Sequence, residues 1–418
     1  MSPTDTAALI EQRSAPRVSP APAGTSRRDR TAPRALLAFA PALVYLGVRL
    51  VGVLILVLMA GPNNTTVHRS LTAWDGQWYL GIATGGYTGA PEGLLDAHGQ
   101  RTPQTPLAFF PGYPTVTGWL ADLTWLSVDT AAFVVSILAG IAAAYALVRI
   151  GMLIRGGSRR VGLILVALFA ASPMGVVLSM TYSEALFCAL AAWSLVFVLR
   201  RQWMWAGVLC ALAGLVRPTG LALVLAVGAA AFACAVEVRR RGGLRPALRP
   251  LGGLLLAPMG LVGYLWWAGA QIRPGAGVLA QLGGWSELQE RGWNSAFDGG
   301  AATLRFTGEA IARSESVHEI GTILVLLAAV ALVVVGFVLR VEWPLLVYGL
   351  GVLIMDLGSN GLMNSKARLL LPAFTLLIPV ALGLAKRKPA TTLVVLVATT
   401  VVSGWFGAHA LVTWPYAI

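Results

Sequence analysis

The sequence predicts an all-helical protein that crosses a membrane about eleven times. Hydrophobic residues make up 57% of its 418 residues and charged residues only 12%, whereas soluble domains carry roughly 25% charged residues. The mean hydropathy is +0.73, and long apolar runs follow one another along most of the chain. This composition excludes an ordinary soluble protein and indicates a polytopic membrane protein.

The elements follow in order from the apolar runs. Residues 1–34 are rich in Pro, Ser, Ala and Arg, which predicts a disordered tail ahead of a membrane domain, 35–418. A membrane helix needs about 20 apolar residues, and the first run is long enough to be an uncleaved signal anchor. The predicted spans are 35–60, 128–150, 161–178, 184–200, 203–216, 219–237, 251–268, 319–338, 343–357, 369–385 and 391–412.

The basic residues indicate how these spans are oriented. Alternate loops hold 21 of the 31 Lys and Arg residues, including those of the N-terminal tail, and such loops are cytoplasmic in membrane proteins. The opposite loops include two long ones, 61–127 and 270–318. We therefore expect a multi-pass protein of the cell membrane with a cytoplasmic N-terminus and its working site outside. The net charge of +13 is a topology signal and does not predict a nucleic-acid partner.

This alternation holds only if residues 107–126 do not cross the membrane. The segment Phe109-Phe110-Pro111-Gly112-Tyr113-Pro114 is too rich in proline for an ordinary span. We expect it to form a second juxtamembrane or re-entrant element on the outer side.

Few residues suggest metal or redox chemistry. Cys188, Cys210 and Cys234 lie in apolar runs and are expected to be packing residues. The four histidines have no ligand spacing, and no D-x-D motif is found where it could work. The sequence therefore predicts neither a metal site nor a cofactor. Asp356, at the end of a span, is expected to be solvated or to cap a helix.

The stretch Leu71–Tyr87 holds the strongest candidate for chemistry. Trp74, Trp78 and Ile82 share one helical face, and Asp75 and Tyr79 share the neighbouring one. This pattern predicts an amphipathic helix in the membrane interface. The alternative is local, because Thr72-x-x-Asp75 matches a capping box, in which Asp75 would only stabilise its own helix.

Five other charged residues lie where a charge is costly or unexpected. Arg49 is near the middle of the first span, where it should meet an acid in a structural or a functional role. Glu184 begins a span and either complements the helix dipole or serves the site. Arg217, Lys366 and Arg368 are basic residues on the outer side. They bind an anionic partner such as a lipid phosphate, or they extend toward lipid headgroups.

An ordered set of short motifs resembles one family. The set comprises Trp74-Asp75-x-x-Trp78-Tyr79-x-x-Ile82-Ala83-x-x-Gly86-Tyr87, Phe109-Phe110-Pro111-x-Tyr113-Pro114, Ser172-Pro173, Tyr182-Ser183-Glu184-Ala185-Leu186-Phe187, Arg217-Pro218-Thr219-Gly220 and Arg368-x-Leu370-Leu371-Pro372. Together these motifs resemble the PIG-V-like integral-membrane mannosyltransferases, relatives of glycosylphosphatidylinositol mannosyltransferase II in the GT-C class of glycosyltransferases. The resemblance covers roughly residues 36–385.

The resemblance implies a fold and a chemistry. The fold is a GT-C-type bundle with two juxtamembrane helices in the first outer loop, and the donor is a polyprenyl-phosphate sugar, usually mannose. The expected base maps onto Asp75, and the residue that contacts the carrier phosphate maps onto Arg368. Gly112 departs from the family by replacing a bulkier residue, and Lys366-Ala367 stand where the family often has Met-Pro.

The sequence thus predicts an inverting glycosyltransferase of the extracytoplasmic face. Asp75 would deprotonate an acceptor hydroxyl of a lipid, glycan or protein, while the lipid phosphate leaves toward Arg368, Lys366 or Arg217. The residues expected to contact substrate are Trp74, Trp78, Tyr79, Tyr87, Phe110, Tyr113 and Glu184. The interpretation requires Asp75 and Arg368 to meet at one site. The alternative function is a polytopic transporter or lipid flippase.

Overall fold

The computed structural model describes residues 31–313, 316–361 and 363–414. The chain falls into two units, residues 1–39 and 40–418. The described part of the first unit is the start of helix α1 (Thr31–Ala60), so helix begins within the last residues of the predicted tail. The rest of that tail, residues 1–30, lies outside the described residues.

The second unit is built from helices, which confirms the predicted all-α class. After α1 come α2 (Val67–Leu71), α3 (Asp75–Gly85), η1 (Thr105–Ala108), α4 (Gly112–Thr124), α5 (Val128–Leu153), α6 (Arg159–Ala170), η2 (Gly175–Ser179), α7 (Glu184–Leu199), α8 (Trp203–Gly214), α9 (Gly220–Gly242), α10 (Leu244–Leu256), α11 (Met259–Ile272), α12 (Val278–Trp293), α13 (Ala301–Arg313), α14 (Val317–Val338), α15 (Trp343–Gly358), η3 (Met363–Ser365), α16 (Lys366–Leu369), η4 (Phe374–Leu377), α17 (Ile378–Ala385) and α18 (Pro389–Val412). In the described ranges the only β-type pairing is one isolated bridge, Phe297 to Ser359.

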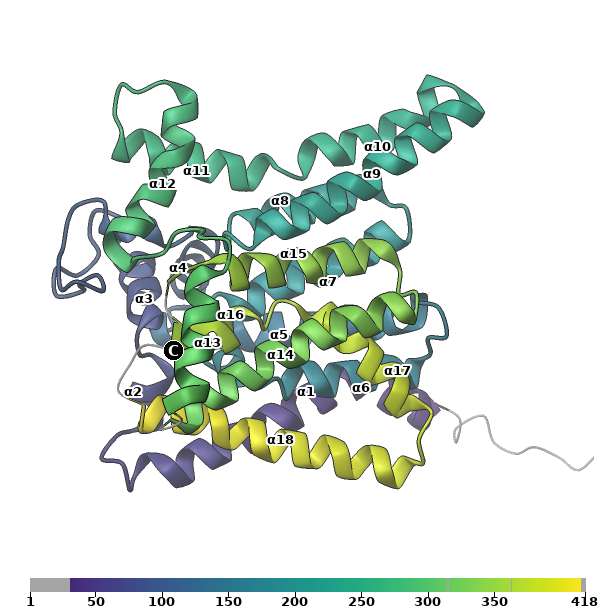
Figure 1. The fold of residues 1–418 in the computed structure, drawn as a ribbon, viewed down its shortest axis with the longest axis horizontal. Coiled ribbons are helices and arrows are strands. Elements are labelled where there is room, and N and C mark those ends of the chain that lie inside the picture. The colour runs from purple at the N-terminus through teal and green to yellow at the C-terminus, as the bar shows by residue number, and fades with distance from the viewer. Residues whose placement is uncertain (1–30, 314–315, 362, 415–418) are drawn as a thin grey trace, which may run out of the picture. The chain divides into compact units, whose positions relative to one another are not determined.

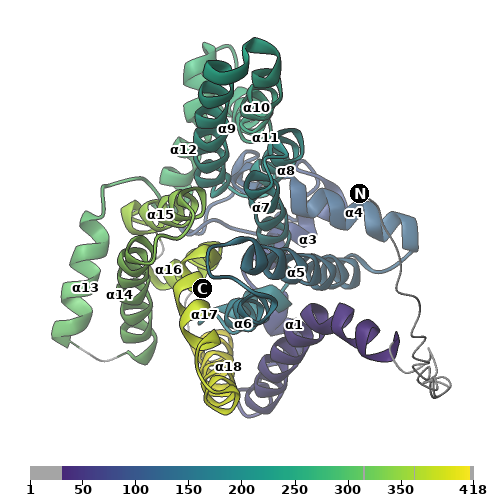
Figure 2. The same ribbon diagram turned by 90° about the vertical axis from the view of Figure 1, so that its right-hand side faces the viewer.

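Helices α5 and α7 form the centre of this unit (Figures 1 and 2). They pack against each other, α6 lies on α5, and α8 lies on α7. Helix α9 pairs with α10 and also contacts α15. Fully buried alanines along α5 and α7, such as Ala143 and Ala192, allow close contact between helix backbones, as small residues do in membrane bundles.

One glycine explains how closely α1 approaches α5. A Cβ atom at Gly140 would lie only 1.9 Å from the Tyr45 hydroxyl, so no larger residue fits beneath that ring. Tyr45 is itself 1% exposed. The sequence of α5 therefore dictates where α1 can cross it.

The structure does not confirm the expected count of eleven spans. Among the described residues, six helices are long and apolar enough to cross a membrane, or up to seven if one bent pair counts as a span. Proline interrupts two of the predicted spans. Helix α6 ends at Ala170, just before Ser172-Pro173, and the pair 363–369 and 374–385 is bent by 68° around Pro372. Three further apolar helices, α7, α8 and α15, are shorter.

Arg49 meets no acid among the residues that the structure describes, contrary to expectation. Its guanidinium donates to the carbonyl oxygen of Ala170 at 2.8 Å and to Ser179 Oγ at 3.0 Å. Ala170 is the last residue of α6, and the free carbonyl groups at a helix C-terminus carry partial negative charge. The break in α6 thus supplies the polar partner that this buried cation needs.

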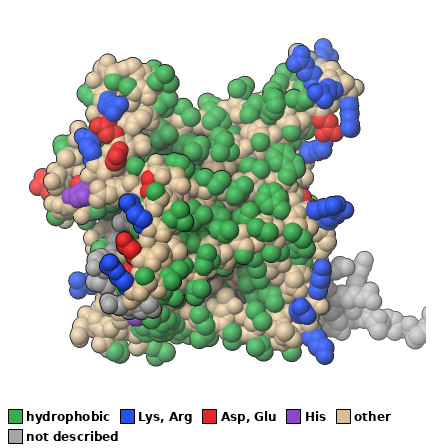
Figure 3. Space-filling model, viewed as in Figure 1, with side chains coloured by type: hydrophobic (Ala, Val, Ile, Leu, Met, Phe, Trp, Pro, Cys, Tyr) green, Lys and Arg blue, Asp and Glu red, His purple; other side chains and the backbone are tan. Residues whose placement is uncertain are grey.

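Charged residues gather at the two ends of the second unit. In Figure 3, Lys and Arg side chains cluster at the right-hand end, where α6, α9, α17 and α18 have their basic termini. The exposed residues there include Arg159, Arg239 and Lys388. The short helices α2, α3, α4, α12 and α13 lie at the opposite end (Figure 1), which we call the short-helix end.

Candidate active site

Asp75 begins α3 at the short-helix end, and an unusual turn presents it. Trp74 has φ 57° and ψ −123°, a region that side-chain-bearing residues rarely adopt and that costs of order 1–3 kcal/mol. The turn is closed by a hydrogen bond from the Gly76 amide to the Ala73 carbonyl at 3.1 Å. The Asp75 amide donates to the Tyr182 hydroxyl at 3.2 Å. A strained turn and a distant tyrosine therefore fix the Asp75 backbone.

The capping-box interpretation of Asp75 is wrong. The N-cap of α3 is Trp74, which makes no side-chain capping bond. Thr72 instead ends α2, where its hydroxyl donates to the His68 carbonyl at 2.9 Å. The helix-interface expectation also needs correction, because Trp78, Tyr79 and Ile82 are buried inside the protein and do not face a bilayer.

Asp75 pairs with Arg368, which lies 293 residues later in the sequence. Arg368 Nη1 donates to Asp75 Oδ2 at 2.6 Å. The Asp75 side chain is 31% exposed and the Arg368 side chain 5%, so one partner is accessible and the other is anchored. The guanidinium also lies over the Tyr182 ring, 5.3 Å from its centroid. The contact required by the sequence interpretation is therefore present.

A second ion pair lies next to the first, on its buried side. Arg217 Nη1 is 2.8 Å from Glu184 Oε1, and Arg368 Nε is 3.8 Å from the same oxygen. Glu184 is fully buried at the N-terminus of α7. The four charged groups, two carboxylates and two guanidiniums, balance formally. We call Asp75, Arg368, Glu184 and Arg217 the charged quartet.

Neutral hydroxyl groups connect the quartet to α3. Arg217 Nη1 donates to Ser183 Oγ at 2.9 Å, and Ser183 Oγ is 2.9 Å from the Tyr79 hydroxyl. Burial raises the pKa of Tyr79 to about 12, although the charge of Arg217 opposes the shift. Burial raises the pKa of Tyr182 well above its usual range, and the negative charge of Asp75 adds to this shift. Both phenols therefore stay neutral at physiological pH; the Tyr182 hydroxyl accepts a hydrogen bond from the Asp75 amide, and the Tyr79 hydroxyl shares one with Ser183.

Most of the predicted substrate-contacting aromatics form a buried cluster beside the quartet. Trp78, Tyr79, Phe110 and Tyr113 are all at most 6% exposed. Trp78 stacks on Phe109, and Tyr79 packs edge-on against Phe109 and Tyr113. In this structure these rings pack α3 against the segment from Phe109 to Tyr113. Of the predicted set, Trp74 is 39% exposed and Tyr87 is half-buried.

The proline-rich segment joins η1 to α4, and helix α12 and the turn after α8 hold it in place. The Trp285 indole and the Gln289 amide both donate to the Ala108 carbonyl, at 3.4 and 3.2 Å. The Gly112 amide donates to the Leu215 carbonyl at 2.8 Å, and a Cβ atom at Gly112 would lie 2.9 Å from that oxygen. Because position 112 holds glycine instead of the bulkier residue of the family motif, α4 can pack directly on the turn that carries Arg217.

Lys366 lies outside the charged quartet. Its side chain is fully buried, and its ammonium donates to the backbone carbonyl oxygens of Asp356 and Ser359 at 2.5 and 2.8 Å. Asp356 is 4% exposed, and its carboxylate has no hydrogen-bond partner among the described residues. Asp356 is thus neither solvated nor a cap, contrary to expectation.

Sequence reasoning singled out all four members of the quartet but missed Tyr182 and Ser183 as their neutral partners. Both lie in the motif that contains Glu184, and that adjacency was the available signal. Within the described ranges, no three His, Cys, Asp or Glu side chains come together as metal ligands.

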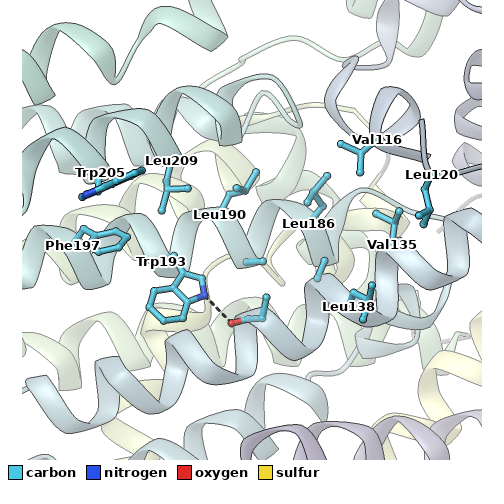
Figure 4. Close-up of a pocket in the computed structure, with 13 residues that line it drawn as sticks. Val116, Leu120, Val135, Leu138, Leu186, Leu190, Trp193, Phe197, Trp205 and Leu209 are labelled. Atoms are coloured by element: carbon cyan, nitrogen blue, oxygen red, sulfur yellow. Dashed lines mark hydrogen bonds between the residues drawn. The ribbon is translucent and has the colours of Figure 1, made fainter. Parts of the chain in front are cut away.

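Figure 4 shows an apolar groove of about 720 Å³ that is lined in part by α7, the helix that begins at Glu184. Side chains of α4, α5, α7 and α8 line it, among them Val116, Leu186 and Trp205. Trp193 Nε1 of α7 donates to the Ala142 carbonyl of α5 at 3.0 Å. Leu186 and Glu184 are two residues apart on α7, so they point to opposite sides of the helix.

The arrangement of helices matches a solved structure. The chain superimposes on the crystal structure of ArnT from Cupriavidus metallidurans bound to undecaprenyl phosphate, with a TM-score of 0.52. The chain has the fold of ArnT. The match covers 87% of this chain and 63% of ArnT, at 15% sequence identity. It confirms the GT-C-type helical architecture predicted from the sequence. No protein-family model and no curated protein matches the chain, so the narrower PIG-V-like resemblance stays a prediction.

Proposed function

We propose that this protein is a membrane glycosyltransferase that moves a sugar from a polyprenyl-phosphate donor to a hydroxyl acceptor on the extracytoplasmic face. The observation that carries the proposal is the contact between Asp75 and Arg368. It places a partly exposed carboxylate, the type of group that serves as a general base, against a buried guanidinium that can bind phosphate. The likeness to ArnT, whose structure holds undecaprenyl phosphate, supports this class of donor.

The reaction we propose is a single displacement with inversion. Asp75 accepts the proton of the acceptor hydroxyl while that oxygen attacks the anomeric carbon. The bond between the anomeric carbon and the phosphate oxygen breaks, and polyprenyl phosphate leaves with the electron pair. The donor phosphate is a diester with one negative charge, whereas the product is a monoester with about −1.5 to −2 charges at neutral pH. Arg368 therefore stabilises the leaving group more than the bound donor, which is the condition for catalysis.

The donor phosphate competes with Asp75 for Arg368 in this mechanism. When the phosphate binds the guanidinium, Asp75 loses its cationic partner and becomes free to accept a proton. Glu184 keeps Arg217 and remains 3.8 Å from Arg368, so the guanidinium stays anchored during the exchange. We assign Glu184 and Arg217 the task of holding Arg368 in place.

The remaining details of the function rest on the sequence. Mannose as the transferred sugar follows from the PIG-V-like resemblance. The extracytoplasmic location follows from the basic residues at the end opposite the quartet, since cytoplasmic loops are rich in Lys and Arg. We assign the exposed indole of Trp74, the residue before Asp75, to stack on the sugar ring of the donor.

A transfer assay tests the proposal. Purified protein in lipid nanodiscs is incubated with radiolabelled polyprenyl-phosphate mannose and a membrane lipid extract, and covalent incorporation of label is measured. We expect incorporation with the wild type and with Asp122→Asn, a control at an exposed acid of α4, but not with Asp75→Asn. Equal incorporation with Asp75→Asn would remove Asp75 from the mechanism. In proteoliposomes, movement of label across the bilayer without covalent transfer would support the transporter or flippase instead.

A further inference from the structure

Lys366 and Arg368 lie two residues apart on the four-residue helix α16, so their side chains leave the helix about 200° apart. Arg368 points to Asp75 and Glu184. Lys366 points the other way, to the end of α15. A single short turn of helix therefore joins the charged quartet to the C-terminus of α15.

The partners of Lys366 are backbone atoms at a helix end. Asp356 lies in the last turn of α15, and Ser359 is its C-cap. The last carbonyl groups of a helix lack intrahelical donors and carry partial negative charge, so a cation there is stabilised. A compact ammonium suits this position, because it donates to both carbonyl oxygens at once from a fully buried site.

The same helix end is joined to the second long loop. The Asp298 amide donates to the Gly358 carbonyl at 2.8 Å, and the Asn360 amide donates to the Ala296 carbonyl at 2.9 Å. The Ala296 amide in turn donates to Asn360 Oδ1 at 2.7 Å. Lys366 is thus bonded to a segment whose neighbouring residues, Gly358 and Asn360, are hydrogen-bonded to the second long loop. Helix α16 is only four residues long and is followed by a bend, so it depends on such a bond for its position.

We propose that Lys366 is a positioning residue that holds Arg368 in register with the donor phosphate and does not contact the substrate itself. This inference rests on the proposed function. With its ammonium fully buried and bonded to two carbonyl oxygens, Lys366 acts on the phosphate only through the placement of α16. Displacing a binding group by about 1 Å costs on the order of 100-fold in catalysis, so removing the Lys366 bonds weakens the Arg368 contact.

A double-mutant cycle on carrier binding tests the assignment without using transfer. Undecaprenyl phosphate is titrated into purified protein in detergent, and intrinsic tryptophan fluorescence gives the Kd. We expect Lys366→Met to raise the Kd about tenfold and Arg368→Ala to raise it at least as much. In the Lys366→Met, Arg368→Ala double variant the Kd should equal that of Arg368→Ala alone, because Lys366 acts only through Arg368.

Controls separate the possible failures. Lys388→Met, the same change at an exposed lysine, should leave the Kd unchanged. Lys366→Gln, which keeps a donor for one carbonyl oxygen, gives a second test if Lys366→Met does not fold. Additive losses in the double variant would mean that Lys366 contacts the phosphate directly. An unchanged Kd in folded Lys366→Met would assign it a purely structural role. Both results overturn the inference, whereas a wild type that does not bind undecaprenyl phosphate overturns the proposed function itself.

Discussion

Replacing Asp75 with asparagine should abolish sugar transfer and yet tighten binding of the carrier phosphate. In the resting structure Arg368 donates to the Asp75 carboxylate at 2.6 Å, so a phosphate must displace an anionic partner to reach the guanidinium. The Asp75→Asn change leaves a neutral amide oxygen in that place. It also shifts the formal charge of the quartet from zero to +1, which favours an anionic ligand.

The size of the effect follows from the bond that is replaced. Arg368 stays charged in the variant, so its bond to the amide oxygen remains charge-assisted, but the attraction between opposite charges is lost. For a partly exposed pair this attraction contributes up to about 1 kcal/mol, so the phosphate has about 1 kcal/mol less to overcome. Since 1.4 kcal/mol corresponds to a factor of ten, the Kd for undecaprenyl phosphate should fall about fivefold.

Titration of undecaprenyl phosphate, followed by tryptophan fluorescence, measures this Kd in the wild type, in Asp75→Asn and in the Asp122→Asn control. The transfer assay is run on the same preparations. A Kd for Asp75→Asn that is equal to or higher than that of the wild type would refute the competition between Asp75 and the phosphate. That outcome would leave open whether Asp75 is the base, which the transfer assay decides separately.

Three further predictions concern the scaffold of the site. Trp74→Gly should have a free energy of unfolding about 1–2 kcal/mol higher than Trp74→Ala, because glycine adopts a φ of 57° and a ψ of −123° without strain. Thermal unfolding measures the difference, and equal stabilities would show that the turn is unstrained. Gly140→Ala should destabilise the folded protein by about 1–3 kcal/mol through overpacking against α1. Gly47→Ala should leave the stability unchanged, because the space around Gly47 is open. Thermal melts in detergent compare the two variants. Because the pKa of Tyr79 is raised in the folded protein, its contribution to stability is complete below a pH of about 10 and is lost as the pH rises to about 12. The unfolding temperature of the wild type should therefore fall toward that of Tyr79→Phe across this range. A constant difference between the two proteins would contradict the shift.

Composition and periodicity predicted the all-helical membrane class because hydropathy measures what a membrane span requires. They are weaker guides to the number of spans. Ser172-Pro173 and Pro372 break apolar runs that hydropathy alone counts as continuous. Backbone geometry decides such cases, and a hydropathy average does not contain it.

The charged quartet could be named from the sequence because charged residues are rare in apolar surroundings. Their partners were harder to predict. Arg49 and Lys366 both bind backbone carbonyl groups at helix ends, and every residue carries such a group, so no side-chain pattern marks the partner. The positive φ of Trp74 is likewise invisible, because the residue type argues against it.

The order in which the quartet is synthesised has a consequence for biogenesis. Glu184 and Arg217 emerge from the ribosome close together and can neutralise each other early. Asp75 is made long before Arg368, its partner in the folded protein. Until residue 368 is in place, Asp75 lacks its cationic partner. Chains truncated before residue 368 would therefore carry an unpaired acid in place of the neutral quartet.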